Sequence, residues 1–494
     1  MKHVVVIGGG IGGLAAAIRL ARRNYRVTVI EKNEQVGGKM DRWDAEGFRF
    51  DTGPTLLTMS FVLEDLLGET GRRLEDHLDL IALDPLCRYF YADGTRLDAS
   101  ADRSAMARRI ARLHEADGRA YARFIDHARG IYEASAEPFL FSGFASLRPL
   151  AMLGRARMLP AVFKLDAFRS LDASVSSYFQ DSRVRQLFNR FATYTGSSPY
   201  RVPATLAVIP YVEFELGGWY VRGGMYRIAE MLESVAREEG VNIVLRRMVA
   251  RIDLREGRAS GVTTADGESI GADAIVCNAD ALYAYAELFG EARPSGASRY
   301  ARLPLSTAGF VLLLGVRREF PALAHHNIFF SPDYRREFDD IVERGVPSDD
   351  PTVYVSISSK TDRDHAPPGC SNLFILVNVP PLTGDGAWGE DASHYRGVVL
   401  RTLARHGVEI AEEAIVVERV LSPGDFAPRY NAYRGAIYGP SSNGRMAAFL
   451  RPPNRARDVR NLFFVGGSSH PGGGVPLVML SGKIVAGLVE EELG

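Results

Sequence analysis

The sequence predicts an α/β fold in which the first and last segments of the chain build one domain around everything between them. Three observations favour this fold. An apolar strand runs into a glycine-rich turn and a helix at the amino terminus. A second strand, glycine-rich turn and helix end the chain, and the middle changes between helical and strand-like patterns. A ligand held by both termini would belong to the whole fold and not to an appended module.

The amino-terminal element has the spacing of a dinucleotide-binding unit. Val4–Ile7 forms a buried strand, and the glycines of Gly8-x-Gly10-x-x-Gly13 provide a tight turn, backbone access to a pyrophosphate and close helix packing. The helix that follows offers free N–H groups and its positive dipole end to phosphate. Glu31 ends the next strand, where a carboxylate accepts both ribose hydroxyls. We therefore expect a Rossmann-like domain here.

The residues after Glu31 favour FAD over NAD. The glycine pair and basic residue of Gly37-Gly38-Lys39 follow closely, and Phe50 to Thr55 comes soon after. This segment resembles the extended FAD fingerprint of the amine-oxidase-like flavoproteins, in which the glycine pair and the basic residue lie against the pyrophosphate. The alternative is a surface turn with a solvated lysine, and the order of the segments weakens it.

The resemblance becomes more specific along the rest of the chain. Four stretches carry it: Asp51-Thr52-Gly53-Pro54-Thr55, residues 217–226, Leu323-Ala324-His325-His326-Asn327, and His470-Pro471-Gly472-Gly473-Gly474-Val475-Pro476. Together they resemble the bacterial-type phytoene desaturases, a family that includes diapophytoene desaturases, hydroxycarotenoid desaturases and terminal carotene oxygenases. The resemblance extends from the first strand to the last helix, and the HPGGGxP element is its most specific piece.

This resemblance implies an FAD-dependent carotenoid desaturase that introduces C=C bonds into a long polyene by hydride transfer to flavin. A hydroxycarotenoid 3,4-desaturase and a terminal carotene oxygenase are the alternatives within the family. Carried over position by position, the resemblance implies cofactor contacts at Gly8, Gly10, Ile11, Gly12, Gly13, Glu31, Lys32, Gly37, Gly38, Lys39, Gly53, Pro54, Thr55, Val249, Gly466, Gly467, Gly474, Val475 and Pro476. Val249 is expected at the adenine, and the helix from Pro476 is expected to point its N-terminus at the flavin.

Two residues are candidates for a direct part in the chemistry. Arg148 matches an arginine in a Phe-x-x-(Phe/Leu)-Arg context of the family, near the flavin or the substrate tunnel, and is equally consistent with a surface arginine facing phosphate. His470 is a candidate to hydrogen-bond the flavin or the substrate end, or else caps the turn that follows it. A strongly placed base is not required, because an allylic cation is itself very acidic. His325-His326 has no third ligand at metal spacing, so no metal is expected.

Bulk properties agree with a protein of the reducing cytoplasm. The 494 residues predict two or three interleaved domains. The net charge of −1 gives no reason to expect nucleic acid as a partner. Cys87, Cys277 and Cys370 are widely spaced and odd in number, which fits neither a disulfide framework nor a metal cluster. The first strand begins too early for a signal peptide, and no run approaches the ~20 apolar residues of a spanning helix.

The patterning along the chain predicts six segments. They are an FAD-binding first segment (1–95), a helical, membrane-associated subdomain (96–205), substrate-domain strands (206–240), a second FAD-binding segment (241–290), a substrate-binding β-sheet domain (291–425) and a carboxyl-terminal FAD-binding segment (426–494). The predicted fold class is therefore a Rossmann-like FAD-binding domain with an interleaved substrate-binding sheet and a helical subdomain on the membrane.

The best membrane candidate lies between Phe139 and Leu171. Aromatic and aliphatic residues alternate there with cations that include Arg155, Arg157 and Lys164, as suits an amphipathic element on anionic lipid. A core-facing helix with solvated basic residues is the alternative. The lipophilic carotenoid favours the membrane, because carrying ~30 buried carbons through water costs on the order of 20 kcal/mol. We expect peripheral attachment to the inner face of the cell membrane.

Two other classes compete with a carotenoid enzyme. A flavin oxidase acting on amines or porphyrinogens should lack HPGGGxP. A non-redox binding protein, comparable to the dissociation inhibitors of prenylated GTPases, requires a lost flavin site, whereas both halves of the site are present here. No second GxGxxG follows a strand, so a quinone or oxygen is the expected electron acceptor and NAD(P)H is not.

Overall fold

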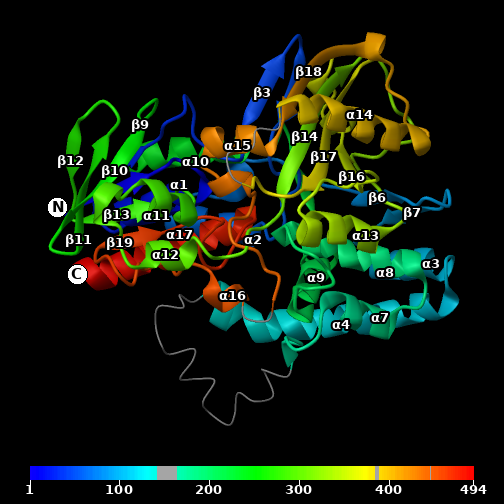
Figure 1. Ribbon diagram of the computed structural model, residues 1–494, viewed down its shortest axis with the longest axis horizontal. Helices are drawn as coiled ribbons and strands as arrows, with labels where there is room; N and C mark the ends of the chain where they lie inside the picture. The colour runs from blue at the N-terminus through cyan, green and yellow to red at the C-terminus, as the bar shows by residue number, and fades with distance from the viewer. Residues whose placement is uncertain (142–163, 384–388, 445–446) are drawn as a thin grey trace.

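The computed structural model describes residues 1–141, 164–383, 389–444 and 447–494, and it confirms a mixed α/β fold. A parallel sheet with its helices lies at one end, and a larger sheet with a layer of helices beneath it lies at the other (Figure 1). Both chain termini lie at the end that carries the parallel sheet.

The parallel sheet has five strands in the order β19-β13-β1-β2-β9. Its strands are β1 (His3–Ile7), β2 (Arg26–Ile30), β9 (Asn242–Val244), β13 (Ala274–Cys277) and β19 (Leu462–Phe464). The central strand, β1, is buried along its whole length and pairs with β2 on one side and β13 on the other. The carboxyl-terminal strand β19 forms the edge beside β13, so segments from three distant parts of the chain complete one sheet.

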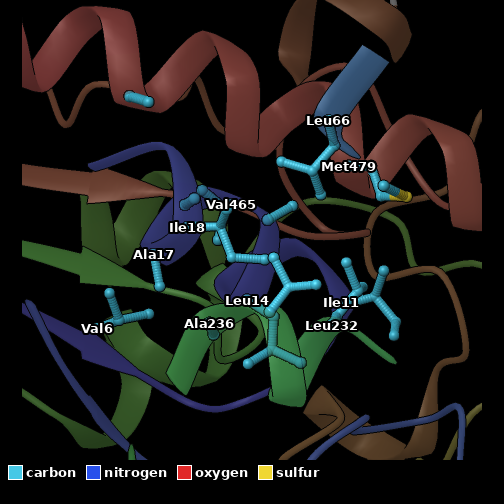
Figure 2. Packing of buried hydrophobic residues seen from close by; sticks show 14 of the residues in the cluster. Val6, Ile11, Leu14, Ala17, Ile18, Leu66, Leu232, Ala236, Val465 and Met479 are labelled. Carbon is cyan, nitrogen blue, oxygen red and sulfur yellow. The ribbon is translucent and has the colours of Figure 1, made fainter. Parts of the chain in front are cut away.

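Helix α1 (Ile11–Arg22) is the centre of the helical layer on this sheet. It packs against α17 (Val475–Leu493), α10 (Arg227–Glu238) and α2 (Phe61–Glu69). Figure 2 shows Leu14 of α1 between Leu232 of α10 and helix α17. The contact with α17 is close because Gly482 allows it: a Cβ at this position would lie 2.9 Å from the backbone nitrogen of Ala16.

A small antiparallel sheet covers the other side of the parallel sheet. It consists of β10 (Val249–Arg255), β11 (Arg258–Thr264) and β12 (Ser269–Gly271). Val249 begins this sheet and packs with Ile7 and Ile30, the last residues of β1 and β2. Helices α11 (Ala281–Glu287) and α12 (Gly296–Tyr300) contribute to the same hydrophobic cluster.

The larger sheet has seven strands in the order β18-β14-β17-β16-β15-β6-β7. They are β6 (Cys87–Phe90), β7 (Arg96–Ala99), β14 (Ala308–Val316), β15 (His326–Phe329), β16 (Val353–Ser356), β17 (Ser371–Val379) and β18 (Ile415–Leu421). One face packs on α14 (Gly389–Arg405) through side chains such as Leu312 and Ile375. The alternate side chains, such as Leu313, Phe374 and Tyr354, point to the opposite face.

A helical layer lies under this opposite face, and aromatic side chains such as Phe124, Phe188 and Phe214 are buried in it among aliphatic ones. Its helices are α3 (Arg103–Ala111), α4 (Glu115–Ser135), α7 (Leu171–Tyr178), α8 (Ser182–Asn189) and α9 (Val208–Glu215). The remaining elements are the strand pairs β3 (Arg42–Ala45) with β4 (Phe48–Asp51) and β5 (Leu80–Ala82) with β8 (Trp219–Val221), and the short helices α13 (Tyr334–Phe338), α15 (Pro423–Tyr430) and α16 (Ala447–Leu450).

Two expectations about the segments are corrected. Residues 206–240 were expected to be substrate-domain strands, but they form α9 and α10 with only the short strand β8 between them. The reason is that α10 repeats its apolar residues at helical spacing, and this face packs on α1. Strand β6 lies in the predicted first FAD-binding segment (1–95), but it pairs with β15 and with β7, so it extends the seven-stranded sheet.

Over the described ranges, no helix has both the length and the apolar character needed to cross a bilayer.

Candidate functional site

The amino-terminal glycine turn forms a cradle in which side chains have no room. Gly8 has a φ of +92°. A Cβ on Gly10 would lie 2.7 Å from the side-chain nitrogen of Asn278, and a Cβ on Gly13 would lie 2.4 Å from the carbonyl oxygen of Gly8. The first amides of α1, from Ile11 onward, have no acceptor within their own helix. A pyrophosphate can approach this backbone directly and accept from it.

Glu31 is placed to hold a ribose at the end of β2. Its side chain is 4% exposed. One carboxylate oxygen accepts from the amide of Gly9 at 2.7 Å, and the other accepts from the amide of Asn33 at 2.9 Å. These two bonds orient the carboxylate and leave lone pairs for two hydroxyl donors. The predicted ribose acceptor therefore fits.

The second glycine pair lies against the first turn. The amide of Gly37 donates to the carbonyl of Gly9 at 2.9 Å. Gly38 has a φ of +61°, and a Cβ there would lie 3.2 Å from the Cα of Gly10. The segment at Gly53 packs against the backbone of this glycine pair's neighbour Lys39. A Cβ on Gly53 would lie 1.9 Å from the carbonyl oxygen of Lys39. The structure thus brings together three glycine segments that the sequence analysis had assigned to the cofactor.

The carboxyl-terminal turn meets the amino-terminal turn at Gly12. A Cβ on Gly12 would lie 3.1 Å from the carbonyl oxygen of Val478 and 3.2 Å from the amide of Gly466. The Gly466 amide donates to the Ser481 hydroxyl at 2.9 Å. The rest of this turn consists of Gly467, Gly474 (φ +117°), and the buried Val475 and Pro476 that begin α17. The N-termini of α1 and α17 are therefore parts of one site.

Lys32 and Lys39, both predicted to contact the cofactor, donate to different parts of the carboxyl-terminal segment. Lys32 donates to the side-chain oxygen of Asn431 at 2.6 Å and to the carbonyl of Pro428, so the carboxyl-terminal segment holds it. Lys39 donates to the carbonyl of Ile437 at 2.5 Å. Burial lowers the pKa of Lys39, and the nearby carboxylate of Asp280 partly opposes this shift.

Three half-buried residues lie beside the carboxyl-terminal glycine turn. They are Lys39, Tyr438 and Arg451. The guanidinium of Arg451 donates to the carbonyls of Gly467 (2.7 Å), Pro440 (3.0 Å) and Tyr438. Burial lowers the pKa of Arg451 to about 10. Burial raises the pKa of Tyr438 to about 12. Arg451 and Tyr438 therefore form part of the surroundings of the carboxyl-terminal glycine turn, since Arg451 bonds to Gly467 and the Tyr438 ring lies against Gly473.

Asn278 is a site residue that the sequence analysis missed. It follows β13, its amide donates to the carbonyl of Ile7 at 2.8 Å, and its side-chain nitrogen donates to the carbonyl of Gly8 at 3.2 Å. Its side chain is also the nearest neighbour of the Cβ positions of Gly10, Gly12 and Gly466. The available signal was a polar residue directly after a buried parallel strand, the end of the sheet at which ligands bind.

The predicted cofactor segment that ends at Thr55 is hydrogen-bonded to the seven-stranded sheet. Pro54 and Thr55 are half-buried, and the Thr55 hydroxyl forms a hydrogen bond of 2.6 Å with the hydroxyl of Tyr354 on β16. Tyr354 in turn bonds to the ring of His326 on β15 at 2.7 Å. The predicted cofactor segment and the predicted substrate sheet are therefore joined by side chains.

The two candidate catalytic residues remain predictions. Arg148 lies outside the described residues. His470 is 5% exposed. Its amide donates to the carbonyl of Pro452 at 3.1 Å, and its carbonyl accepts from the side chain of Asn454 at 2.8 Å. These bonds hold the backbone of the turn ahead of the glycines, and both interpretations of the His470 side chain remain predictions.

Within the described parts of the chain, no three His, Cys, Asp or Glu side chains lie together as a metal site. Glycine turns with no room for a Cβ, free helix N-termini and an oriented ribose acceptor together form a site for FAD. Such a site defines the class of FAD-dependent oxidoreductases.

Comparison with known proteins agrees with this class. The chain matches the family of flavin-containing amine oxidoreductases over residues 11–489, and it belongs to that family. It is 38% identical over 485 residues to a zeta-carotene-forming phytoene desaturase of Myxococcus xanthus, covering 98% of this chain and 93% of that protein. It is 36% identical over 493 residues to a 4,4'-diapolycopene oxygenase of a Methylomonas species, covering 100% and 99%. A 1-hydroxycarotenoid 3,4-desaturase of Flavobacterium sp. (strain P99-3) is also 36% identical over 493 residues, covering 99% of both chains.

Solved structures share the fold at lower identity. An oxidoreductase from Methanosarcina mazei superposes with a TM-score of 0.64 at 18% identity, covering 98% of this chain and 99% of that one. Wild-type putrescine oxidase bound to putrescine superposes with a TM-score of 0.63 at 15% identity, covering 99% of both chains.

Proposed function

We propose that this flavoenzyme is a carotenoid desaturase, which introduces C=C bonds into a long polyene of the phytoene, diapophytoene or partly desaturated type. The observation that carries the proposal is the similarity, along nearly the whole chain, to three proteins named for carotenoid substrates. The complete FAD site supports it, because removal of hydrogen from an unactivated C–C unit needs a strong organic acceptor.

The residues of this chain would bind and orient both molecules. When bound, FAD supplies the acceptor for two electrons and one hydrogen. Glu31 and the turn at Gly10 would hold its ribose and pyrophosphate. The large sheet, which Thr55 joins to the FAD segment through Tyr354, would support the hydrocarbon chain beside the flavin.

The test is incubation of the enzyme with a panel of carotenes in liposomes, followed by identification of the products. A product with additional C=C bonds is the expected result. Oxygen at the chain end would identify a terminal oxygenase instead, and no change in any carotene would contradict the proposal. Flavin absorbance of the purified protein separates all these enzymes from a non-redox binding protein.

A hydroxylated carotenoid is the second candidate substrate. It is favoured by a pocket of about 370 Å³ whose lining combines apolar residues, such as Leu303 and Leu450, with Ser441 and Asn443. The amide of Asn443 donates to the Ser441 hydroxyl at 2.9 Å, so these two polar residues form one unit. Faster turnover of 1-hydroxycarotenoids than of the matched carotenes would support 3,4-desaturation.

The proposed electron acceptor is a quinone or oxygen. An anaerobic assay in liposomes without quinone should stop after about one turnover per flavin, and added quinone should restore turnover. Sustained desaturation with NAD⁺ alone would contradict this.

The proposed location is the inner face of the cell membrane, with the cytoplasmic enzyme attached peripherally through the segment from Phe139 to Leu171. Most of this segment, including Arg155 and Arg157, lies outside the described residues. Lys164 is exposed, and Phe168 is 62% exposed. An exposed phenylalanine beside a cation suits an interface with lipid.

Replacement of Arg155, Arg157 and Lys164 by Glu tests this attachment. Each cation near an anionic surface contributes ~1 kcal/mol, so the triple variant should no longer sediment with anionic vesicles. Its flavin content should match the wild type, because the cofactor contacts lie in other segments. Unchanged sedimentation of a folded, yellow variant would assign the segment to the protein core or to another surface.

A further inference from the structure

Arg451 is a cation at the carboxyl-terminal glycine turn that no carboxylate pairs with. Its guanidinium donates to the carbonyl of Gly467 at 2.7 Å and to the carbonyls of Pro440 and Tyr438. None of the ion pairs between described residues includes Arg451. Carbonyl oxygens accept hydrogen bonds but carry no net charge, so these bonds orient the guanidinium without compensating its charge.

Arginines that are buried elsewhere in the described chain do have a carboxylate partner. Arg19 bonds to Asp65 at 2.8 Å. Arg190 bonds to Glu213 at 2.9 Å. Burial lowers the pKa of Arg451 to about 10, so Arg451 is still charged at neutral pH. A cation that is partly shielded from water and lacks a counter-charge is unfavourable unless an anion binds beside it.

The guanidinium touches the glycine turn at two points. One is its bond to the carbonyl of Gly467. The other is Gly472, where a Cβ would lie 3.8 Å from the Cζ atom of Arg451. Gly474, two residues further on, is the N-cap of α17. The charge of Arg451 therefore lies at the turn that leads into the helix N-terminus predicted to face the flavin.

Two further ionisable groups belong to the same region. Lys39 donates to the carbonyl of Ile437, and Asp280 accepts from the amide of Leu282 at 2.8 Å. The carboxylate of Asp280 acts against the lowering of the pKa of both Lys39 and Arg451. Two cations thus share one carboxylate, and the three groups carry one net positive charge when all are ionised.

We propose that Arg451 positions the carboxyl-terminal glycine turn and supplies the positive charge that stabilises FAD after it has accepted a hydride. In that step a C–H bond of the substrate breaks, and its hydrogen moves to the isoalloxazine with both electrons of the bond. The isoalloxazine therefore gains one hydrogen and one negative charge. The substrate, left as a cation, releases a proton to water as the new C=C bond forms. This role of Arg451 rests on the proposed function only for the source of the hydride.

Three substitutions separate the charge of Arg451 from its hydrogen bonds. Arg451→Lys keeps the charge but loses the planar fork that reaches three carbonyls. Arg451→Gln keeps two N–H donors but loses the charge. Asp280→Asn changes the charge in the opposite direction, because it removes the shared carboxylate. Asparagine can still cap α11 as Asp280 does, by accepting from the amide of Leu282.

Arg455→Gln is the matched control. Arg455 lies in the same segment, is half-buried like Arg451, and donates to the carbonyl of Leu488 at 3.2 Å. Its charge differs from that of Arg451 in having carboxylate partners, Glu491 at 3.4 Å and Glu492 at 3.7 Å. Loss of the Arg455 charge should therefore leave the flavin unaffected.

The readouts are the Kd of the apoprotein for oxidised FAD and the two-electron potential of the bound flavin, measured against reference dyes without carotene. Arg451→Gln should weaken binding of reduced FAD about 10-fold more than binding of oxidised FAD, as for loss of one opposite charge near a buried group. This ratio corresponds to a potential that is lower by about 30 mV. Arg451→Lys should keep the wild-type potential even if its Kd rises, Asp280→Asn should raise the potential, and Arg455→Gln should change neither quantity.

Equal potentials of the wild type and Arg451→Gln would overturn the role of the charge, and so would equal decreases in Arg451→Gln and Arg451→Lys. If Arg451→Gln does not fold, Asp280→Asn decides: a raised potential supports the role, and an unchanged one overturns it. Failure of the proposed function would be seen separately, as a yellow wild-type enzyme that changes no carotene although its variants show the expected potentials.

Discussion

The nucleotide side and the substrate-sheet side of the site obtain their polar atoms from different parts of the polypeptide. On the nucleotide side the backbone supplies most of them, at the glycine turns around Gly10, Gly38 and Gly466. On the sheet side, side chains such as Tyr354 and His326 supply them from neighbouring strands. The first kind of site tolerates almost no added atoms, whereas the second depends on the identity of each side chain.

The cost of substitution should differ accordingly. A methyl group added at a glycine turn overlaps with backbone, which cannot move without disturbing the sheet or helix it belongs to. A side chain removed from the sheet side leaves the backbone in place but exposes an unpaired buried partner. Four substitutions test this contrast.

The largest effect on FAD binding is expected for Gly13→Ala. Its Cβ would lie 2.4 Å from the Gly8 carbonyl oxygen, so α1 must move away from the turn. Such overpacking costs ~1–3 kcal/mol or more, and the protein should purify without flavin absorbance. Gly487→Ala in α17 is the matched control, with nothing within 4 Å of its Cβ position. It should keep FAD and gain ~0.4–1 kcal/mol of stability. An FAD-loaded Gly13→Ala protein would contradict the cradle.

The next effect concerns stability on the sheet side. The buried guanidinium of Arg190 donates to Glu213 at 2.9 Å and to the Tyr89 hydroxyl at 2.9 Å. Arg190→Met leaves Glu213 as an uncompensated buried charge, which should lower the free energy of unfolding by ~3–5 kcal/mol. The double variant with Glu213→Leu should recover most of the loss in a thermal unfolding experiment. Equal melting of the single and double variants would show that the two residues are not coupled.

Glu31→Ala should weaken FAD binding. Charge-assisted hydrogen bonds contribute ~1.5–3 kcal/mol, so the Kd for FAD should rise roughly 10- to 150-fold. Titration of the apoprotein with FAD measures this change. Glu34→Ala is the control, because Glu34 is 73% exposed and pairs with the exposed Arg246 at 3.5 Å. Wild-type affinity in Glu31→Ala would mean that the ribose is held elsewhere.

The smallest effect is expected for Asn278→Ala. It removes one neutral hydrogen bond to the Gly8 carbonyl, worth ~0.5–1.5 kcal/mol, so FAD should bind roughly 2- to 10-fold more weakly. Asn242→Ala, at an exposed position of β9 in the same sheet, should leave binding unchanged. Equal behaviour of the two variants would remove Asn278 from the site.

The nucleotide side could be predicted because its information is local. Strand, glycine turn, helix and Glu31 follow one another within about thirty residues, and each glycine is needed for a backbone reason that spacing alone reveals. The class of fold, the FAD site and the meeting of the two termini could therefore be read from the chain. Residues 206–240 were misassigned because a short strand beside an amphipathic helix gives a mixed pattern.

Only the tertiary structure decided which side chains meet across that framework. Asn278 joins the two glycine turns, Arg451 binds three carbonyls, and Thr55 reaches His326 through Tyr354, although these partners are between 11 and 299 residues apart. No periodicity records such pairs, because strand order and register bring them together only after the sheets have formed. A site built from backbone atoms can be recognised in the sequence by its glycines. A network of side chains can be recognised only once the packed structure shows which residues are in contact.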